Sequence, residues 1–222
     1  MDTPSATRPD AYSFSAEEVR VLGVLIEKSR ITPDNYPLSV NAIMQGSNQT
    51  TSRDPVMHLD ETRIQDALDS LQQHKLVTQR DQASARVAKY EHQIRLRFSL
   101  PPPEQAVLAT LMLRGPQTAG EIRQRSERMH GFASIDEVDS VLTHLAEKYP
   151  PLVCALPRQP GTKETRYMHL MSGEPTEEML AAATTGTSRA AAATSVAGEL
   201  EALRAEIKTL REEFEQFRAQ FN

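Results

Sequence analysis

A segment near the start of the chain recurs 86 residues later with the same spacing of apolar residues, at residues 21–28 and 107–114. In each copy aliphatic side chains follow one another three and four residues apart, which places them along one face of a helix. The apolar positions are Val21, Leu22, Leu25 and Ile26 in the first copy and Val107, Leu108, Leu111 and Met112 in the second. We therefore predict that each copy forms the first helix of a small domain.

The repeat includes two further blocks in the same order. Residues 64–71 correspond to residues 138–145, and residues 89–92 correspond to residues 166–169, at offsets of 74 and 77 residues. The offsets differ because loops tolerate insertions better than helices do. A chain of 222 residues can hold two such units. We predict a disordered N-terminus at residues 1–13 and then two duplicated domains, at residues 14–98 and 99–171.

Each domain is predicted to contain three helices followed by a two-stranded hairpin. Capping boxes at Ser15, Thr118 and Ser134 mark helix starts, and a short helix is expected to begin after Ser39 and to end at Gly46. This order is that of a winged helix, in which the hairpin is the wing. The fold class is therefore mainly α with small β-hairpins, arranged as two tandem winged-helix domains. The hairpin strands are expected at residues 76–80, 86–90, 152–156 and 166–170.

The junction between the two domains has two distinct patterns. Residues 93–98 alternate polar and apolar side chains, which predicts an extended segment with one covered face. Three prolines follow at residues 101–103. Proline cannot occupy a helix interior or the centre of a sheet, so we expect these residues to stiffen the connection.

The C-terminal part is predicted to contain a linker and a coiled coil. Residues 172–198 are rich in Ala and Thr without an apolar stripe, which predicts a flexible linker. Residues 199–222 have a heptad pattern with opposite charges at the e and g positions, which favours a parallel homodimer. The alternative is a single amphipathic helix that folds back on the domains. The predicted dimerisation residues are Leu200, Leu203, Ile207, Leu210, Phe214, Phe217 and Phe221.

Composition and motifs indicate binding rather than catalysis. The six histidines do not occur at metal-ligand spacing, and the single cysteine, Cys154, can form neither a thiolate metal site nor an intrachain disulfide. No phosphate loop, nucleophile elbow or dinucleotide fingerprint occurs in the sequence. We therefore predict a non-enzymatic protein without cofactor or metal. Because no segment has the pattern of a signal peptide or a membrane span, we expect it in the cytoplasm.

The charge pattern leaves two classes of partner open, DNA and protein. The net charge of -5 gives no general attraction to nucleic acid, and both predicted third helices carry more acidic than basic residues. Arginines and lysines collect instead near the hairpins and in the second helix of domain two, which predicts a DNA contact made largely by the wings. The alternative is that these cations pair with the acidic helices. The candidate nucleic-acid-binding residues are Arg80, Arg86, Lys89, Arg95, Arg97, Arg123, Arg125, Arg158 and Lys163.

A polar loop at residues 46–55 is longer than the turn of an ordinary helix-turn-helix unit. Polar loops on rigid scaffolds often bind ligands. The loop therefore supplies three candidate binding residues, Asn48, Gln49 and Arg53. Arg53 beside Asp54 has the alternative role of locking the loop.

Several short motifs resemble the bacterial YceH family, whose members have unknown function. They are residues 32–38 (TPDNYPL), 48–49 (NQ), 52–56 (SRDPV), 89–92 (KYEH) and 113–118 (LRGPQT) with Gly120 and Glu121. The resemblance covers residues 14–170 and implies tandem winged-helix domains. The family pattern commonly has a cysteine and a lysine in the polar loop, and residues 45–53 of this chain have neither. The resemblance therefore implies no reactive cysteine or lysine–phosphate contact here.

The sequence thus supports two hypotheses of function. The first is a non-enzymatic, DNA-associated protein of transcription-regulator type with basic wings. The second is a protein–protein adaptor, similar to the tandem winged-helix scaffolding subunit of bacterial chromosome-condensing complexes, whose acidic third helices bind a basic partner. Neither hypothesis involves a membrane.

The coiled-coil prediction can be tested by truncation. Deletion of residues 196–222 is expected to convert a dimer into a monomer, because the heptad seam is removed. Sedimentation velocity of the full chain and the truncated chain measures this change directly. A truncated chain that remains dimeric would place the interface in the domains.

Overall fold

The protein is described by a computed structural model that covers residues 12–80, 87–158, 164–177 and 179–180. The described residues up to Thr176 belong to one compact unit. The predicted coiled coil, most of the predicted linker and the candidate residues Arg86 and Lys163 lie outside the described residues, as do residues 1–11.

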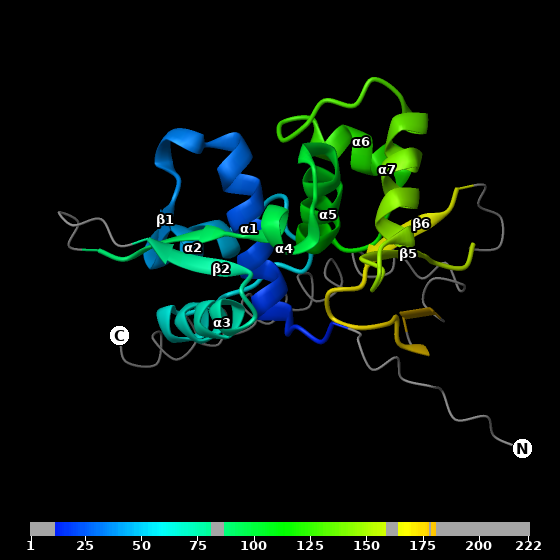
Figure 1. The fold of residues 1–222 in the computed structure, drawn as a ribbon. Coiled ribbons are helices and arrows are strands. Elements are labelled where there is room, and N and C mark those ends of the chain that lie inside the picture. Colours follow the sequence, from blue (N-terminus) through cyan, green and yellow to red (C-terminus); the bar gives the residue numbers. More distant parts are fainter. Residues whose placement is uncertain (1–11, 81–86, 159–163, 178, 181–222) are drawn as a thin grey trace, which may run out of the picture. The chain divides into compact units, whose positions relative to one another are not determined.

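The same order of helices and strands occurs twice along the chain (Figure 1). The first half contains α1 (Ala16–Ile31), η1 (Pro33–Asn35), β1 (Leu38–Ser39), α2 (Val40–Ser47), α3 (Glu61–Gln73), β2 (Val77–Arg80) and β3 (Lys89–His92). The second contains α5 (Pro102–Arg114), β4 (Gln117–Thr118), α6 (Ala119–Ser126), α7 (Ile135–Glu147), β5 (Val153–Ala155) and β6 (Arg166–His169). The first half ends with α4 (Ile94–Phe98).

Each half has one small antiparallel sheet, and the strand orders correspond. The orders are β1-β3-β2 and β4-β6-β5, so the last strand of each hairpin is central in both sheets. The described chain is therefore mainly helical with small antiparallel sheets, as the sequence predicted. The recurrence of element order and sheet order agrees with the predicted repeat.

Side-chain caps fix the helix starts that the sequence indicated. Capping boxes at Ser15 and Thr118 are confirmed, since in each the hydroxyl accepts from the backbone three residues later and the glutamate there accepts in return. Ser134 caps α7, but the Glu137 carboxylate accepts from the Ala133 N–H at 2.8 Å, so the box predicted there is incomplete. Ser39 caps α2 as predicted.

Gly46 does not end α2, which continues to Ser47, so that prediction is wrong. A Cβ atom at Gly46 would lie 2.7 Å from Cγ1 of Val24. The glycine is therefore required for the close approach of α2 to α1 and not for a C-terminal cap.

The prediction of an extended segment at residues 93–98 is also wrong, because these residues include the helix α4. The Gln93 N–H donates to the Leu76 carbonyl, and the Gln93 carbonyl then accepts from the N–H groups of Leu96 and Arg97. Ile94 is fully buried whereas Leu96 is 79% exposed, so the alternating apolar residues do not share a buried face. A short helix lets these backbone groups pair locally where the strand β3 has ended.

The three prolines begin α5. Pro101 is the N-cap and Pro102 and Pro103 occupy the first helical turn. Proline is well accommodated there because the first N–H groups of a helix have no partner inside the helix. The prolines avoid the helix interior, as predicted, but they start a helix and do not form a separate connecting segment.

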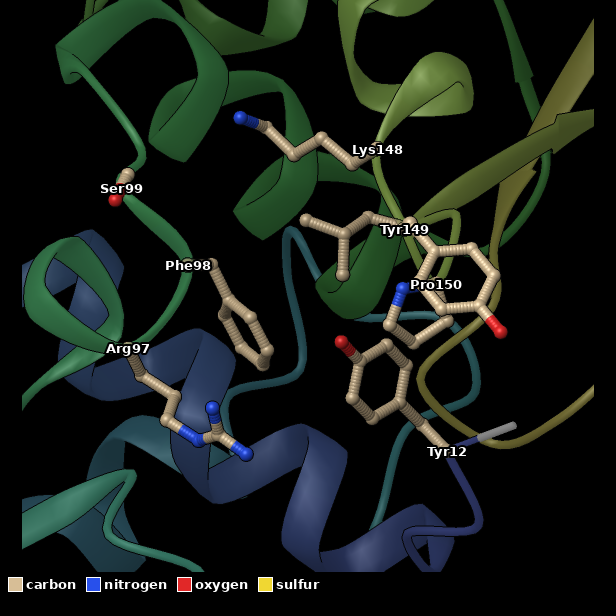
Figure 2. A pocket seen from close by; sticks show the side chains of 8 residues that line it. Tyr12, Arg97, Phe98, Ser99, Lys148, Tyr149 and Pro150 are labelled. Carbon is tan, nitrogen blue, oxygen red and sulfur yellow. The ribbon is translucent and has the colours of Figure 1, made fainter. Parts of the chain in front are cut away.

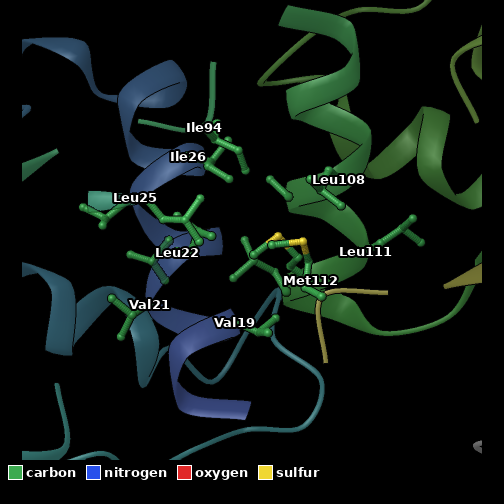
Figure 3. Close-up of a cluster of buried hydrophobic side chains, with 14 of the residues drawn as sticks. Val19, Val21, Leu22, Leu25, Ile26, Ile94, Leu108, Leu111 and Met112 are labelled. Atoms are coloured by element: carbon green, nitrogen blue, oxygen red, sulfur yellow. The ribbon is translucent and has the colours of Figure 1, made fainter. Parts of the chain in front are cut away.

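The core is organised around α1 and α5, which pack against each other. Figure 3 shows Val19, Leu22 and Ile26 of α1 close to Leu108 and Met112 of α5. Residues 19–27 and 104–113 are buried without interruption, so both helices are covered on all sides and not only along the predicted stripe. The buried apolar side chains of both halves form one continuous cluster.

Candidate macromolecular interface

The polar loop between α2 and α3 is closed by Asn48. Its amide nitrogen donates to the Leu59 carbonyl and its amide oxygen accepts from the Leu59 N–H, both at 2.8 Å. The side chain therefore pairs with a backbone unit eleven residues away. Gln49, the next candidate binding residue, is half-buried.

Arg53 anchors the same loop to α1. Its guanidinium forms two hydrogen bonds with the Glu27 carboxylate, of 2.7 Å and 3.1 Å, and a third with the Gly46 carbonyl at 2.9 Å. The predicted locking role is thus fulfilled through Glu27 and not through Asp54. Burial by itself would raise the pKa of Glu27, but the hydrogen bonds and the charge of Arg53 hold that pKa below its ordinary value.

Arg20, on α1, binds backbone carbonyls at the two ends of the polar loop of residues 46–55. This residue is 2% exposed, and its guanidinium donates to the carbonyls of Ser47 and Pro55, at 3.0 Å and 2.6 Å. Burial and the nearby charge of Arg53 lower the pKa of Arg20 to about 10. Neither Arg20 nor Glu27 was predicted from the sequence. Their signal is two charges seven residues apart on one helix face, within residues 19–27, where every other residue is apolar or glycine.

The loop also contacts the second half of the chain. The Asp54 N–H donates to the Leu113 carbonyl at 2.9 Å, and the Arg114 guanidinium donates to the Ser52 hydroxyl at 2.6 Å. Both acceptor and donor belong to the C-terminal end of α5. The loop that was predicted as a ligand site therefore ties α1, α2 and α5 together, with Asn48 and Arg53 engaged inside the fold.

Removal of Arg53 should destabilise the protein strongly. Arg53→Met leaves the Glu27 carboxylate, whose side chain is 10% exposed, without its main partner, and such a loss costs about 3–5 kcal/mol of unfolding free energy. Arg53→Met combined with Glu27→Leu removes both charges and should recover part of that loss. Urea denaturation measures the unfolding free energy of the wild type, of Arg53→Met and of the double variant.

Arg63→Met is the matched control, because Arg63 is 60% exposed and lies 4.0 Å from Glu17. An exposed pair of this kind contributes less than about 1 kcal/mol. If Arg53→Met and Arg63→Met have the same unfolding free energy, the buried pair does not have the role assigned to it.

The described candidate nucleic-acid-binding residues of the first half lie on β2, β3 and α4. Arg80 is opposite Lys89 in the sheet, with its side chain 61% exposed and paired with Glu91 at 2.8 Å. Arg95 and Arg97 are exposed on α4. The guanidinium of Arg97 lies 5.8 Å from the ring centroid of Phe98.

The described candidate residues of the second half form intramolecular contacts. Arg123 donates to the carbonyls of Phe132 and Ala133. Arg125 donates to Gln117 at 2.7 Å and pairs with Glu121 at 3.1 Å. Arg158 donates to the Thr165 hydroxyl across its hairpin. Arg125 therefore pairs with an acidic residue of its own helix and not with α7.

The third helix of each half presents carboxylates on its exposed side. Both helices bury one aliphatic face, with Ile64, Leu68 and Leu71 on α3 and Val138, Leu142 and Leu145 on α7. Asp66 and Asp69 are exposed on the opposite side of α3, and Glu61 and one cation, Arg63, are also exposed on this helix. The opposite side of α7 exposes Asp136 and Glu147.

Two histidines occupy equivalent positions at the ends of the central strands. His92 ends β3 and His169 ends β6, and the Nδ1 atom of each is buried without a hydrogen bond. Burial lowers the pKa of both to about 4. His92 also lies 3.0 Å from the Ser29 hydroxyl through Nε2. These neutral rings are parts of the packed sheets.

Because the pKa values of His92 and His169 are lowered in the folded protein, we predict that the protein loses stability in mild acid. Their folded pKa of about 4 lies below the ordinary value of 6.5, so the unfolded chain takes up protons first as the pH falls. The loss should begin near pH 6.5 and reach about 1–2 kcal/mol per histidine at pH 5. Urea denaturation at pH 7 and pH 5 measures it. The double variant His92→Gln with His169→Gln should lose most of this dependence, whereas His144→Gln, at an exposed site on α7, should retain it.

Comparison with known proteins places the chain in a family. Residues 14–162 match the family described as "Protein of unknown function, DUF480". The chain belongs to the DUF480 family. The match spans nearly the same residues as the resemblance to YceH and is consistent with it.

Relatives within the DUF480 group are bacterial proteins named UPF0502. A UPF0502 protein of Aromatoleum aromaticum is 67% identical over 172 residues, which are 78% of this chain and 75% of the relative. A UPF0502 protein of Azoarcus sp. (strain BH72) is 59% identical over 200 residues, or 90% of this chain and 87% of the relative. A third, of Geobacter sulfurreducens, is 54% identical over 160 residues, or 71% and 72%.

The described part of this DUF480 chain covers residues 12–80, 87–158, 164–177 and 179–180. Among those residues, no group of three or more His, Cys, Asp or Glu side chains could hold a metal ion. Over the same residues, no helix has the length and apolar character needed to cross a membrane.

Proposed function

We propose that this protein is a non-enzymatic adaptor built from two winged helices, whose third helices α3 and α7 bind a basic protein surface. The order helix, short strand, two helices and hairpin, together with a three-stranded antiparallel sheet, supports the winged-helix assignment for both halves. The carboxylates on the exposed sides of α3 and α7 are the observation on which the adaptor function rests.

The acidic faces disfavour the usual use of a third helix in DNA binding. A helix that enters the major groove brings its exposed side chains close to two rows of phosphates. A carboxylate and a phosphate about 7 Å apart in water repel each other by about 0.6 kcal/mol, and a carboxylate attracts an ammonium group by a similar amount. Asp66 and Asp69 on α3 would therefore oppose a DNA backbone and favour a lysine-rich surface.

The arginines of the second half further support the adaptor function. Arg123 and Arg125 donate to backbone carbonyls and to Gln117, and Arg125 also pairs with Glu121. A phosphate would have to compete with these contacts. The second helix, α6, is therefore a weak source of DNA affinity.

A second candidate function, DNA association through the first half, rests on a different observation. Arg80 and Lys89 are directly opposite in the β2–β3 pair. Like charges in this position destabilise a sheet. Glu91, 2.8 Å from Arg80, offsets part of this repulsion, and a bound phosphate would offset more of it. Arg95 and Arg97 add two exposed cations on α4.

Fluorescence anisotropy at low salt distinguishes the two functions. The probes are a labelled lysine-rich peptide and a labelled random-sequence DNA duplex. We expect the peptide to bind the full chain and the double variant Asp66→Asn with Asp69→Asn to bind it about fivefold more weakly, because two attractive charge pairs are lost. The matched control is Asp34→Asn with Glu174→Asn, which removes the same charge from exposed positions outside α3 and should change the affinity less than twofold.

Binding of the DNA duplex is the outcome that would support the second candidate function. Binding of the duplex in place of the peptide, weakened by salt and by removal of Arg86, Lys89, Arg95 and Arg97, would favour DNA association over the adaptor function. The adaptor function would be contradicted if the peptide did not bind, or if the two double variants lowered its affinity equally.

A further inference from the structure

A cavity of about 560 Å³ lies between α4 and the segment that joins α7 to β5 (Figure 2). This volume is within the range of sites that hold small molecules. The candidate interface on α3 and α7 does not include it. Its lining residues are Tyr12, Arg97, Phe98, Ser99, Lys148, Tyr149, Pro150 and Leu152.

One wall of the cavity is aromatic and already packed. The Tyr12 ring meets the Phe98 ring edge to face, with centroids 5.3 Å apart, and stacks on Phe14 at 6.2 Å. Figure 2 shows the Tyr12 and Phe98 rings directed towards the same space. Burial raises the pKa of the Tyr12 hydroxyl. A flat apolar ring bound in the cavity can pack against the rings of Tyr12 and Phe98.

The charges that line the cavity are positive. Arg97 and Lys148 contribute them, and no acidic residue is among the described lining residues. The Lys148 ammonium is 3.2 Å from a carboxylate oxygen of Glu104, which is 6% exposed, so this lysine has a buried counter-ion. Arg97 contacts the face of Phe98, and its charge is the one available to balance an anionic ligand.

The border of the cavity has two further unusual features. Ser99 has φ 53° and ψ 43°, a left-handed conformation that costs a residue other than glycine about 1–2 kcal/mol. Ser99 is also the C-cap of α4, and a left-handed residue is a common way for a helix to end. Tyr149, which also lines the cavity, is 87% exposed and is the most exposed large apolar residue of the described chain.

We propose that this cavity binds a small planar aromatic carboxylate. The ring packs against Tyr12 and Phe98, and the carboxylate pairs with the Arg97 guanidinium. The Lys148 ammonium, which has three N–H donors, adds a hydrogen bond. The proposal is independent of the adaptor function, because its residues lie outside the exposed faces of α3 and α7.

Calorimetric titration of the full chain with 1-naphthoate tests the proposal, and 1-naphthamide is the neutral probe of the same shape. Pairing with a guanidinium should make the carboxylate bind at least fivefold more tightly than the amide. Arg97→Gln should abolish this preference while leaving amide binding within twofold. Arg95→Gln is the matched control, since Arg95 is exposed on the same helix but does not line the cavity.

A second variant tests the aromatic wall. Phe98→Leu should weaken both probes at least threefold, because a ring contact is lost while the residue stays apolar. Circular dichroism spectra check that each variant is folded. Equal affinity for the two probes in the wild type, no saturable binding of 1-naphthoate, or the same loss with Arg95→Gln as with Arg97→Gln would overturn the proposal.

Discussion

The packing of α1 against α5 is the contact on which the rest of the structure depends. Gly23 is placed where a Cβ atom would lie 3.0 Å from Leu113, so the absence of a side chain sets how closely the two helices approach. Because each helix is also the first helix of its own half, this contact merges two small cores into one cluster. A larger shared core buries a greater fraction of the chain than two separate ones would.

Buried charge determines where the long loop lies on this core. Glu27 and Arg53 satisfy each other, and Arg20 satisfies two loop carbonyls, so the cost of removing these charges from water is offset by well-directed hydrogen bonds. The same loop then contacts Leu113 and Arg114 at the end of α5. Polar loop residues that were predicted to bind a ligand thereby connect α2 with α5.

The two proposals use what these internal contacts leave exposed. The aliphatic faces of α3 and α7 are buried in the core, and their outward faces are acidic. The cavity is lined by α4 and by the segment after α7, which come from different halves of the chain. A ligand there would contact both halves, and its binding free energy would add to the stability of their association.

The sequence by itself determined the repeat, most helix starts and the inward faces of the third helices, because helical periodicity and capping are local properties of a few neighbouring residues. Only the tertiary structure decided what depends on distant partners. Residues 94–98 became a helix because β3 had ended, Gly46 served a helix crossing, and Arg53 found Glu27 twenty-six residues away. The cavity likewise brings Tyr12 to Phe98, and no local spacing encodes a contact between residues so far apart.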